Sequence, residues 1–313
     1  MLPRLLLPFF VLLLLFPGIC VKGAANGLSL WLFTLVPTFF PFLFLSNLMI
    51  SYRMTDKISS VLSHIMRPLF RISAQGCYIV LMGFLCGYPM GAKLCGDFVA
   101  AGYISKEEGE YLITFCNNPS PMFLIGYIMS ECMHESFSHI LILTLFYATP
   151  IFTGILLAKL PFSPYYHKKT DFNRGKLNNS ANFTKDMRTF AVIQKSMLDA
   201  FQTLLYLGGY VILFNILSVL CFNLFQGLPM LNYIFAGFLE MTTGAMYLKS
   251  CGLTPTIINL LIPLTTIFGG CSTLAQTKAM LTDSKISIWH YLLGKILQVV
   301  VFSLGYFFLL RWI

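Results

Sequence analysis

Residues 83–121 read GFLCGYPMGAKLCGDFVAAGYISKEEGEYLITFCNNPSP, an apolar stretch that two short motifs interrupt. The first motif is Gly87-Tyr88-Pro89 and the second is Asn117-Asn118-Pro119. Proline cannot continue a helix and restricts the residue before it, so each motif predicts a helix end. The apolar run from Gly76 to Gly87 would form roughly 18 Å of helix, too short to cross a hydrocarbon core of about 30 Å. The chain is therefore predicted to enter a membrane, turn back and enter again.

Two helix-start signals follow these motifs. Ser105 and Glu108 have the spacing of a capping box, which predicts a new helix that reaches Phe115. Ser120 suits the N-cap of a further helix, and Pro121 suits its first position. Two half-helices are therefore predicted to meet near the membrane midplane at the second motif.

The second half of the chain repeats this pattern. Gly83-Phe84-Leu85 followed by Gly91-Ala92 matches Gly237-Phe238-Leu239 followed by Gly244-Ala245, with one residue of gap. The same register aligns the second motif of the first half with Phe268-Gly269-Gly270-Cys271. A second unit of broken helices is therefore predicted.

The second unit is expected to break at two places. Leu231 to Met241 breaks at Thr242-Thr243-Gly244, and Pro255 to Phe268 breaks at Gly269-Gly270. After the second break, Ser272 or Thr273 is expected to cap the next helix.

Composition places the whole chain in a membrane. Hydrophobic residues make up 57% and charged residues 11%, with a mean hydropathy of +0.76, whereas a soluble domain carries roughly 25% charged residues. The nine cysteines form no C-x-x-C pair and are interpreted as inert thiols. Five further apolar blocks have the length of a crossing: Leu5 to Val21, Leu28 to Ile50, Phe137 to Leu160, Leu204 to Phe225, and Ile288 to Trp312.

The basic residues indicate the topology. They cluster in a loop around Lys57 and in a longer loop from Ser163 to Lys185, so both loops are predicted to be cytoplasmic. This explains the net charge of +9 without a nucleic-acid partner. The first loop, from Asp56 to Ile72, has helical apolar spacing and is expected to lie on the membrane surface. With both loops inside, the two broken units have opposite orientations.

The expected fold class is an all-α polytopic membrane protein with two inverted repeats, re-entrant hairpins and broken transmembrane helices. Residues 1–75 hold two crossings, the first retained although it is similar to a signal peptide, and the surface helix. Residues 76–160 hold the first repeat and its following helix. Residues 161–189 form a flexible basic loop, and residues 190–313 hold the second repeat.

Candidate solute contacts lie at the breaks. Irregular backbone at membrane depth is tolerated only where it lines protein or a water-filled cavity, and transporters with inverted repeats bind solutes there. The alternative is that the Asn and Ser side chains only cap broken helices. The candidates are Tyr88, Lys93, Asn117, Asn118, Ser120, Glu240, Thr242, Thr243, Ser272, Thr273 and Gln276.

Two charged candidates have open roles. Lys93 either pairs with a solute carboxylate or extends to the membrane interface. Glu240 either carries a coupling proton or forms an ion pair, with Lys93 or Lys278 as partner.

Catalytic signatures are absent from the sequence. It contains no G-x-S-x-G, H-E-x-x-H or Walker A pattern, and His134 with Glu131 and Glu135 is interpreted as a solvated cluster rather than a metal site. The protein is therefore expected not to be an enzyme and to need no metal or cofactor. A small solute and the lipid bilayer are the expected partners, and a homo-oligomeric state is left open.

The motifs carry a resemblance to a known family. Gly87 to Lys93, Phe115 to Pro121, Glu240 to Gly244 and Phe268 to Gly270 followed by Gln276 resemble the YlbJ-type sporulation integral membrane proteins, which carry two nucleoside-recognition ("Gate") domains. The resemblance implies a spore-forming bacterium and transport of dipicolinic acid across the outer forespore membrane. The label "nucleoside recognition" describes the fold and does not establish a nucleoside ligand.

Three functions remain open at this point. The first is transport of a small anionic or aromatic metabolite, with dipicolinic acid as the specific solute. The second is transport of a nucleoside or nucleobase. The third is a membrane scaffold for spore maturation that transports nothing, in which the helix breaks only aid packing.

Overall fold

The computed structural model describes residues 2–52, 54–133, 139–159, 185–224 and 235–311, and these contain helices and no strand. Five helices are long and apolar enough to span a membrane, so the protein is an all-α polytopic membrane protein. These spans are Pro17–Ser51, His139–Lys159, Thr189–Leu224, Pro255–Met280 and Ile288–Leu310.

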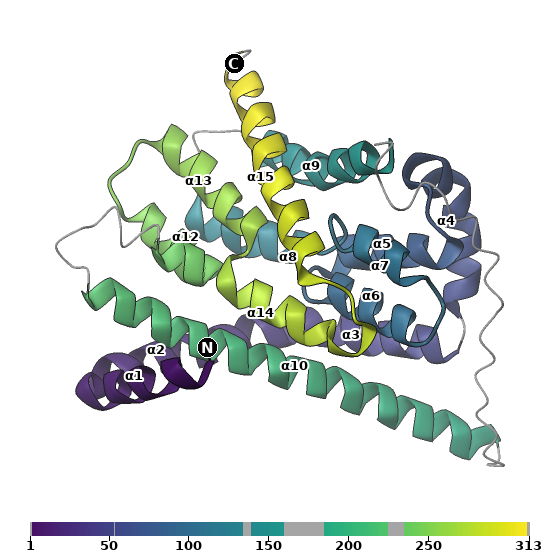
Figure 1. The fold of residues 1–313 in the computed structure, drawn as a ribbon, viewed down its shortest axis with the longest axis horizontal. Coiled ribbons are helices and arrows are strands. Elements are labelled where there is room, and N and C mark those ends of the chain that lie inside the picture. The colour runs from purple at the N-terminus through teal and green to yellow at the C-terminus, as the bar shows by residue number, and fades with distance from the viewer. Residues whose placement is uncertain (1, 53, 134–138, 160–184, 225–234, 312–313) are drawn as a thin grey trace.

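The helices form a layered bundle in which the long helix α10 runs along one edge (Figure 1). Helices α2 and α3 pack on α10, α9 packs on α15, and α13 packs on both α12 and α15. The first-half helices are α1 (Leu2–Leu15), α2 (Pro17–Leu30), η1 (Trp31–Leu35), α3 (Val36–Ser51), α4 (Met54–Phe70), α5 (Ala74–Cys86), α6 (Met90–Ala100), α7 (Lys106–Leu112), α8 (Pro121–Phe123), η2 (Leu124–Cys132) and α9 (His139–Lys159). The second-half helices are α10 (Lys185–Leu224), α12 (Met241–Lys249), α13 (Pro255–Phe268), α14 (Gly270–Met280), η4 (Thr282–Ser284) and α15 (Ile288–Leu310).

The N-terminal crossings differ from the expected ones. The first helix ends at Leu15 because Phe16, which precedes a proline, leaves the helical conformation, and Pro17 begins the next helix. That helix continues to Ser51 without the expected gap between Val21 and Leu28. The predicted crossing from Leu5 to Val21 is therefore wrong.

Two glycines in this region let α2 pack closely on α10. A Cβ on Gly23 would lie 2.9 Å from the Cα of Ile216, and one on Gly27 would lie 2.8 Å from the Cα of Ile212. The pair has the G-x-x-x-G spacing that lets two membrane helices approach closely. Gly23 and Gly27 therefore serve the contact between α2 and α10, and they do not end a helix.

The surface helix expected over Asp56 to Ile72 corresponds to α4, which ends at Phe70 and meets α5 at an angle of 91°. Val61 and Ile65 on α4 are about three-quarters exposed, as suits an apolar face in contact with lipid. The loop expected over residues 161–189 lies largely outside the described residues, and α10 already begins at Lys185. The division into domains and the opposite orientation of the two halves stay predictions.

The aligned glycines meet in the same way in both halves. A Cβ on Gly83 would lie 3.3 Å from the Cα of Gly91, and a Cβ on Gly244 would collide with the Cα of Gly237. The following break packs on each pair: a Cβ on Gly91 would lie 2.5 Å from the carbonyl oxygen of Cys116, and a Cβ on Gly270 would lie 2.9 Å from that of Phe238. Both units therefore use glycine to bring two short helices and a broken backbone together.

Candidate solute pocket between the broken helices

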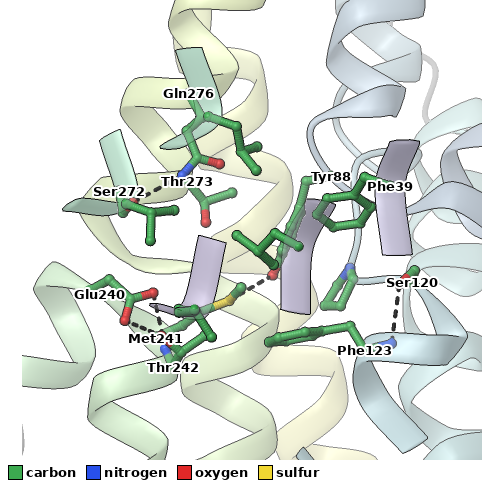
Figure 2. Close-up of a pocket in the computed structure, with 15 residues that line it drawn as sticks. Phe39, Tyr88, Ser120, Phe123, Glu240, Met241, Thr242, Ser272, Thr273 and Gln276 are labelled. Atoms are coloured by element: carbon green, nitrogen blue, oxygen red, sulfur yellow. Dashed lines mark hydrogen bonds between the residues drawn. The ribbon is translucent and has the colours of Figure 1, made fainter. Parts of the chain in front are cut away.

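A pocket lies where the breaks of the two units face each other (Figure 2). Only about 30 Å³ inside it is open to the centre of a water-sized sphere, so a bound solute requires the lining side chains to move apart. The wall away from the breaks comes from the first span and α10. The lining residues are Leu30, Leu35, Phe39, Tyr88, Pro119, Ser120, Phe123, Leu207, Val211, Glu240, Met241, Thr242, Ser272, Thr273 and Gln276.

Tyr88 connects the first break to the second unit. Helix α5 ends at Cys86, as the sequence predicts, and Tyr88 projects from the turn before α6. Its hydroxyl donates a 2.7 Å hydrogen bond to the carbonyl oxygen of Thr266, and the sulfur of Met241 lies 3.2 Å from the same hydroxyl (Figure 2). The ring is buried and forms part of the pocket wall.

Ser120 begins a helix at the second break, as predicted. Its hydroxyl accepts a 3.2 Å hydrogen bond from the Phe123 amide, and Pro121 occupies the first helical position. Gly87, at φ +79°, packs directly on the Ser120 backbone, so the two turns of the first unit touch. A side chain at Gly87 would be strained and would also collide with Ser120.

The other predicted helix start in the first unit is confirmed at Ser105, but only half of its capping box forms. The Ser105 hydroxyl accepts from the Glu108 amide, at 3.1 Å, but the Glu108 carboxylate accepts from the Ser73 amide, at 2.6 Å, and does not return to Ser105. Helix α7 ends at Leu112, earlier than the expected Phe115. Glu108 therefore joins the start of α7 to the start of α5.

Glu240 acts as a helix cap. The expected break at Thr242-Thr243-Gly244 is wrong, because the helical turn ends at Leu239 and α12 begins at Met241. The Glu240 carboxylate accepts from the amides of Thr242, at 3.1 Å, and Thr243, at 2.8 Å, and also from both threonine hydroxyls. These contacts satisfy donors that every helix start leaves unpaired. Residues 231–234 of this predicted segment lie outside the described residues.

The last break is built by glycines. Gly269 and Gly270 have φ of +80° and +74°, so α13 ends at Phe268 as predicted and α14 starts at Gly270. The expectation that Ser272 or Thr273 caps α14 is wrong, because both lie inside its first turn and the cap position is Gly269. Ser272 instead accepts a 3.0 Å hydrogen bond from the side-chain amide of Gln276, within the pocket wall (Figure 2).

Four predicted contacts lie outside the pocket lining. Lys93 forms a 2.6 Å ion pair with the half-exposed Asp97, one helical turn away. Thr243 turns towards Asn215, and its hydroxyl lies 3.0 Å from the Asn215 side-chain oxygen. Neither Lys93 nor Lys278 lies within ion-pair distance of Glu240 among the described residues.

Asn117 and Asn118 are buried and bind other parts of the protein. Asn117 accepts from the Ala92 amide, at 3.2 Å, and donates to the Thr277 hydroxyl, at 3.0 Å, which links the break at Asn117 to both α6 and α14. Asn118 donates to the Phe115 carbonyl oxygen, at 2.6 Å.

The prediction missed two kinds of residue. Leu30, Leu35, Phe39, Leu207 and Val211 line the pocket but carry no chemical mark in the sequence. Lys295 and Gln298 are fully buried in α15 beside Asn118, and they could have been noticed as polar residues within an apolar block.

The chemistry of the pocket suits binding of a small molecule. Hydroxyls and an amide face an otherwise apolar space, and Glu240 is the one charged side chain among the lining residues. The described residues contain no group of three His, Cys, Asp or Glu side chains that could hold a metal ion, and their cysteines form no disulfide.

This chain is similar to the sporulation integral membrane protein YlbJ of Bacillus subtilis (strain 168). The two are 26% identical over 326 aligned positions, which cover 95% of this chain and 78% of the relative. No family model matches the chain, and no solved structure matches it. The resemblance to the YlbJ-type proteins that the motifs indicate is confirmed, and the protein is an integral, multi-pass membrane protein.

Proposed function

We propose that this protein transports a small anionic or aromatic solute across a membrane, with the solute bound between the two broken units. The observation that carries the proposal is that polar residues from the breaks of both units line one pocket. Tyr88 and Ser120 come from the first unit, and Glu240, Thr242, Ser272, Thr273 and Gln276 come from the second.

Interrupting a helix inside a membrane costs free energy. Backbone groups released from a helix in a membrane must be satisfied by protein or by water in a cavity. Here the side chains that satisfy these groups, Tyr88, Ser120 and Glu240, line the pocket, and transporters built from repeats bind their solutes at such places. Packing alone would be served as well by continuous apolar helices.

Dipicolinic acid is the solute that we propose. The YlbJ-type resemblance implies it, and the relative is named for sporulation. The pocket offers the aromatic rings of Phe39, Tyr88 and Phe123 to a pyridine ring, and the hydroxyls of Ser272 and Thr273 can donate to carboxylate oxygens.

A nucleoside or nucleobase is the second candidate. The lining residues include the acidic Glu240 but no Lys, Arg or His. A neutral heteroaromatic base would meet no repulsion from that carboxylate and could stack on the same rings.

The first test is a thermal-shift series on purified protein with dipicolinate, nucleosides and nucleobases. A bound solute raises the unfolding temperature by mass action. Uptake into liposomes then tests transport of the solute that binds. We expect Gln276→Leu, in the pocket wall, to weaken binding by roughly tenfold. Gln202→Leu, at an exposed position of α10, is the matched control.

A membrane scaffold that transports nothing would give no thermal shift with any of these solutes. Binding without uptake would also contradict transport. A shift with nucleosides and none with dipicolinate would establish the second candidate.

A further inference from the structure

A lysine lies fully buried in the last span without a carboxylate partner. Lys295, about two turns into α15, is 1% exposed. Its ammonium group lies 3.0 Å from the side-chain oxygen of Asn118 and 3.4 Å from that of Gln298. Among the described residues, no acidic side chain lies within ion-pair distance of it.

Both amide oxygens are held in place for this cation. The Asn118 side-chain nitrogen donates to the Phe115 carbonyl oxygen, and the Gln298 side-chain nitrogen donates to the Thr114 carbonyl oxygen, at 2.8 Å. The two amides cannot turn without losing these bonds. They solvate the ammonium group, but being neutral they leave its charge uncompensated.

An uncompensated charge in a membrane span is costly, and such residues usually serve a function. Lys295 is also close to the pocket. Its ammonium group lies over the ring of Tyr88, 5.6 Å from the centroid, and Tyr88 lines the pocket. Asn118 immediately precedes Pro119 and Ser120, which line it as well.

We propose that Lys295 is the counter-ion for a carboxylate of the transported solute, which reaches it when the Tyr88 ring moves aside. This inference rests on the proposed transport function and restricts it to solutes that carry a negative charge. It also gives Tyr88 the role of a barrier between the pocket and the buried cation.

The test compares two probes that differ mainly in charge, dipicolinate and its neutral diamide, pyridine-2,6-dicarboxamide. Their binding to purified full-length protein is measured for the wild type, for Lys295→Met, and for Lys278→Met, which removes an exposed lysine of α14. We expect Lys295→Met to weaken dipicolinate binding by about thirtyfold or more, and diamide binding by less than about threefold. Lys278→Met should change neither.

Asn118→Asp is a second variant that keeps the lysine. It places a carboxylate where the amide oxygen now contacts Lys295, so an internal ion pair should exclude the dianion, and the same ion pair offsets the loss of the Asn118 donor to the Phe115 carbonyl oxygen. This variant decides the matter if Lys295→Met does not fold.

Equal binding of dipicolinate by the wild type and both variants would overturn the inference and leave transport intact. An equal loss of both probes in Lys295→Met would also overturn it, because a purely structural lysine acts on both alike. Failure of the wild type to bind any solute of the thermal-shift series would instead reject the proposed function, and the inference with it.

Discussion

The hydroxyl of Tyr88 donates a 2.7 Å hydrogen bond to the carbonyl oxygen of Thr266, 178 residues away in the chain. Thr266 lies in the last turn of α13, where the break at Gly269 removes the helical partners of the carbonyl groups. A side chain released by the break at Gly87 to Pro89 therefore satisfies a backbone group released by the break at Gly269. The two units are joined through their interruptions.

Tyr88→Phe should lower the free energy of unfolding by about 2 kcal/mol, because the buried Thr266 carbonyl loses its donor. Denaturant unfolding in mixed micelles measures the change. Tyr52→Phe, at an exposed position, is the control and should have no effect. An unchanged stability of the Tyr88 variant would mean that water replaces the hydroxyl.

Gly244→Ala should destabilise the protein by roughly 2 kcal/mol, because the added methyl group collides with the backbone of Gly237. Gly209→Ala, inside α10 with open space around it, should instead be neutral or stabilising by up to about 1 kcal/mol. The same unfolding experiment compares them. Similar stabilities for the two variants would show that the glycine contact is not tight.

Glu240→Ala should cost about 1 kcal/mol of stability, because α12 loses the acceptor for its first amides. Glu240→Gln should cost less, since one side-chain oxygen can still accept. Thermal unfolding of both variants checks the order. A Gln variant that is normally stable but has lost proton-coupled uptake would indicate that Glu240 carries a proton.

Lys93→Ala should leave solute uptake unchanged, because Lys93 pairs with the half-exposed Asp97 and does not line the pocket. Asn117→Ala should lower uptake, by roughly tenfold, since it removes the bonds to Ala92 and Thr277 that hold the break at Asn117 against α6 and α14. Liposome uptake at matched protein content measures both. The reverse order would restore Lys93 as a candidate solute contact.

The sequence by itself determined the membrane class and the positions of three helix breaks, at Gly87 to Pro89, at Asn117 to Ser120 and at Gly269. These are local properties, because proline lacks an amide hydrogen and glycine alone adopts positive φ at little cost. The repeat itself was also visible in the sequence, because both halves keep glycine at the positions where close backbone packing leaves no room for a side chain.

Only the tertiary structure decided which polar residues face the pocket. Lys93 and Lys295 look alike in sequence, yet one reaches a partially exposed aspartate on its own helix and the other lies buried against Asn118, 177 residues away. Gly23 and Gly27 likewise support packing on α10 and do not end a helix. Side-chain surroundings depend on contacts between distant segments, and a local pattern of residue types does not specify those contacts.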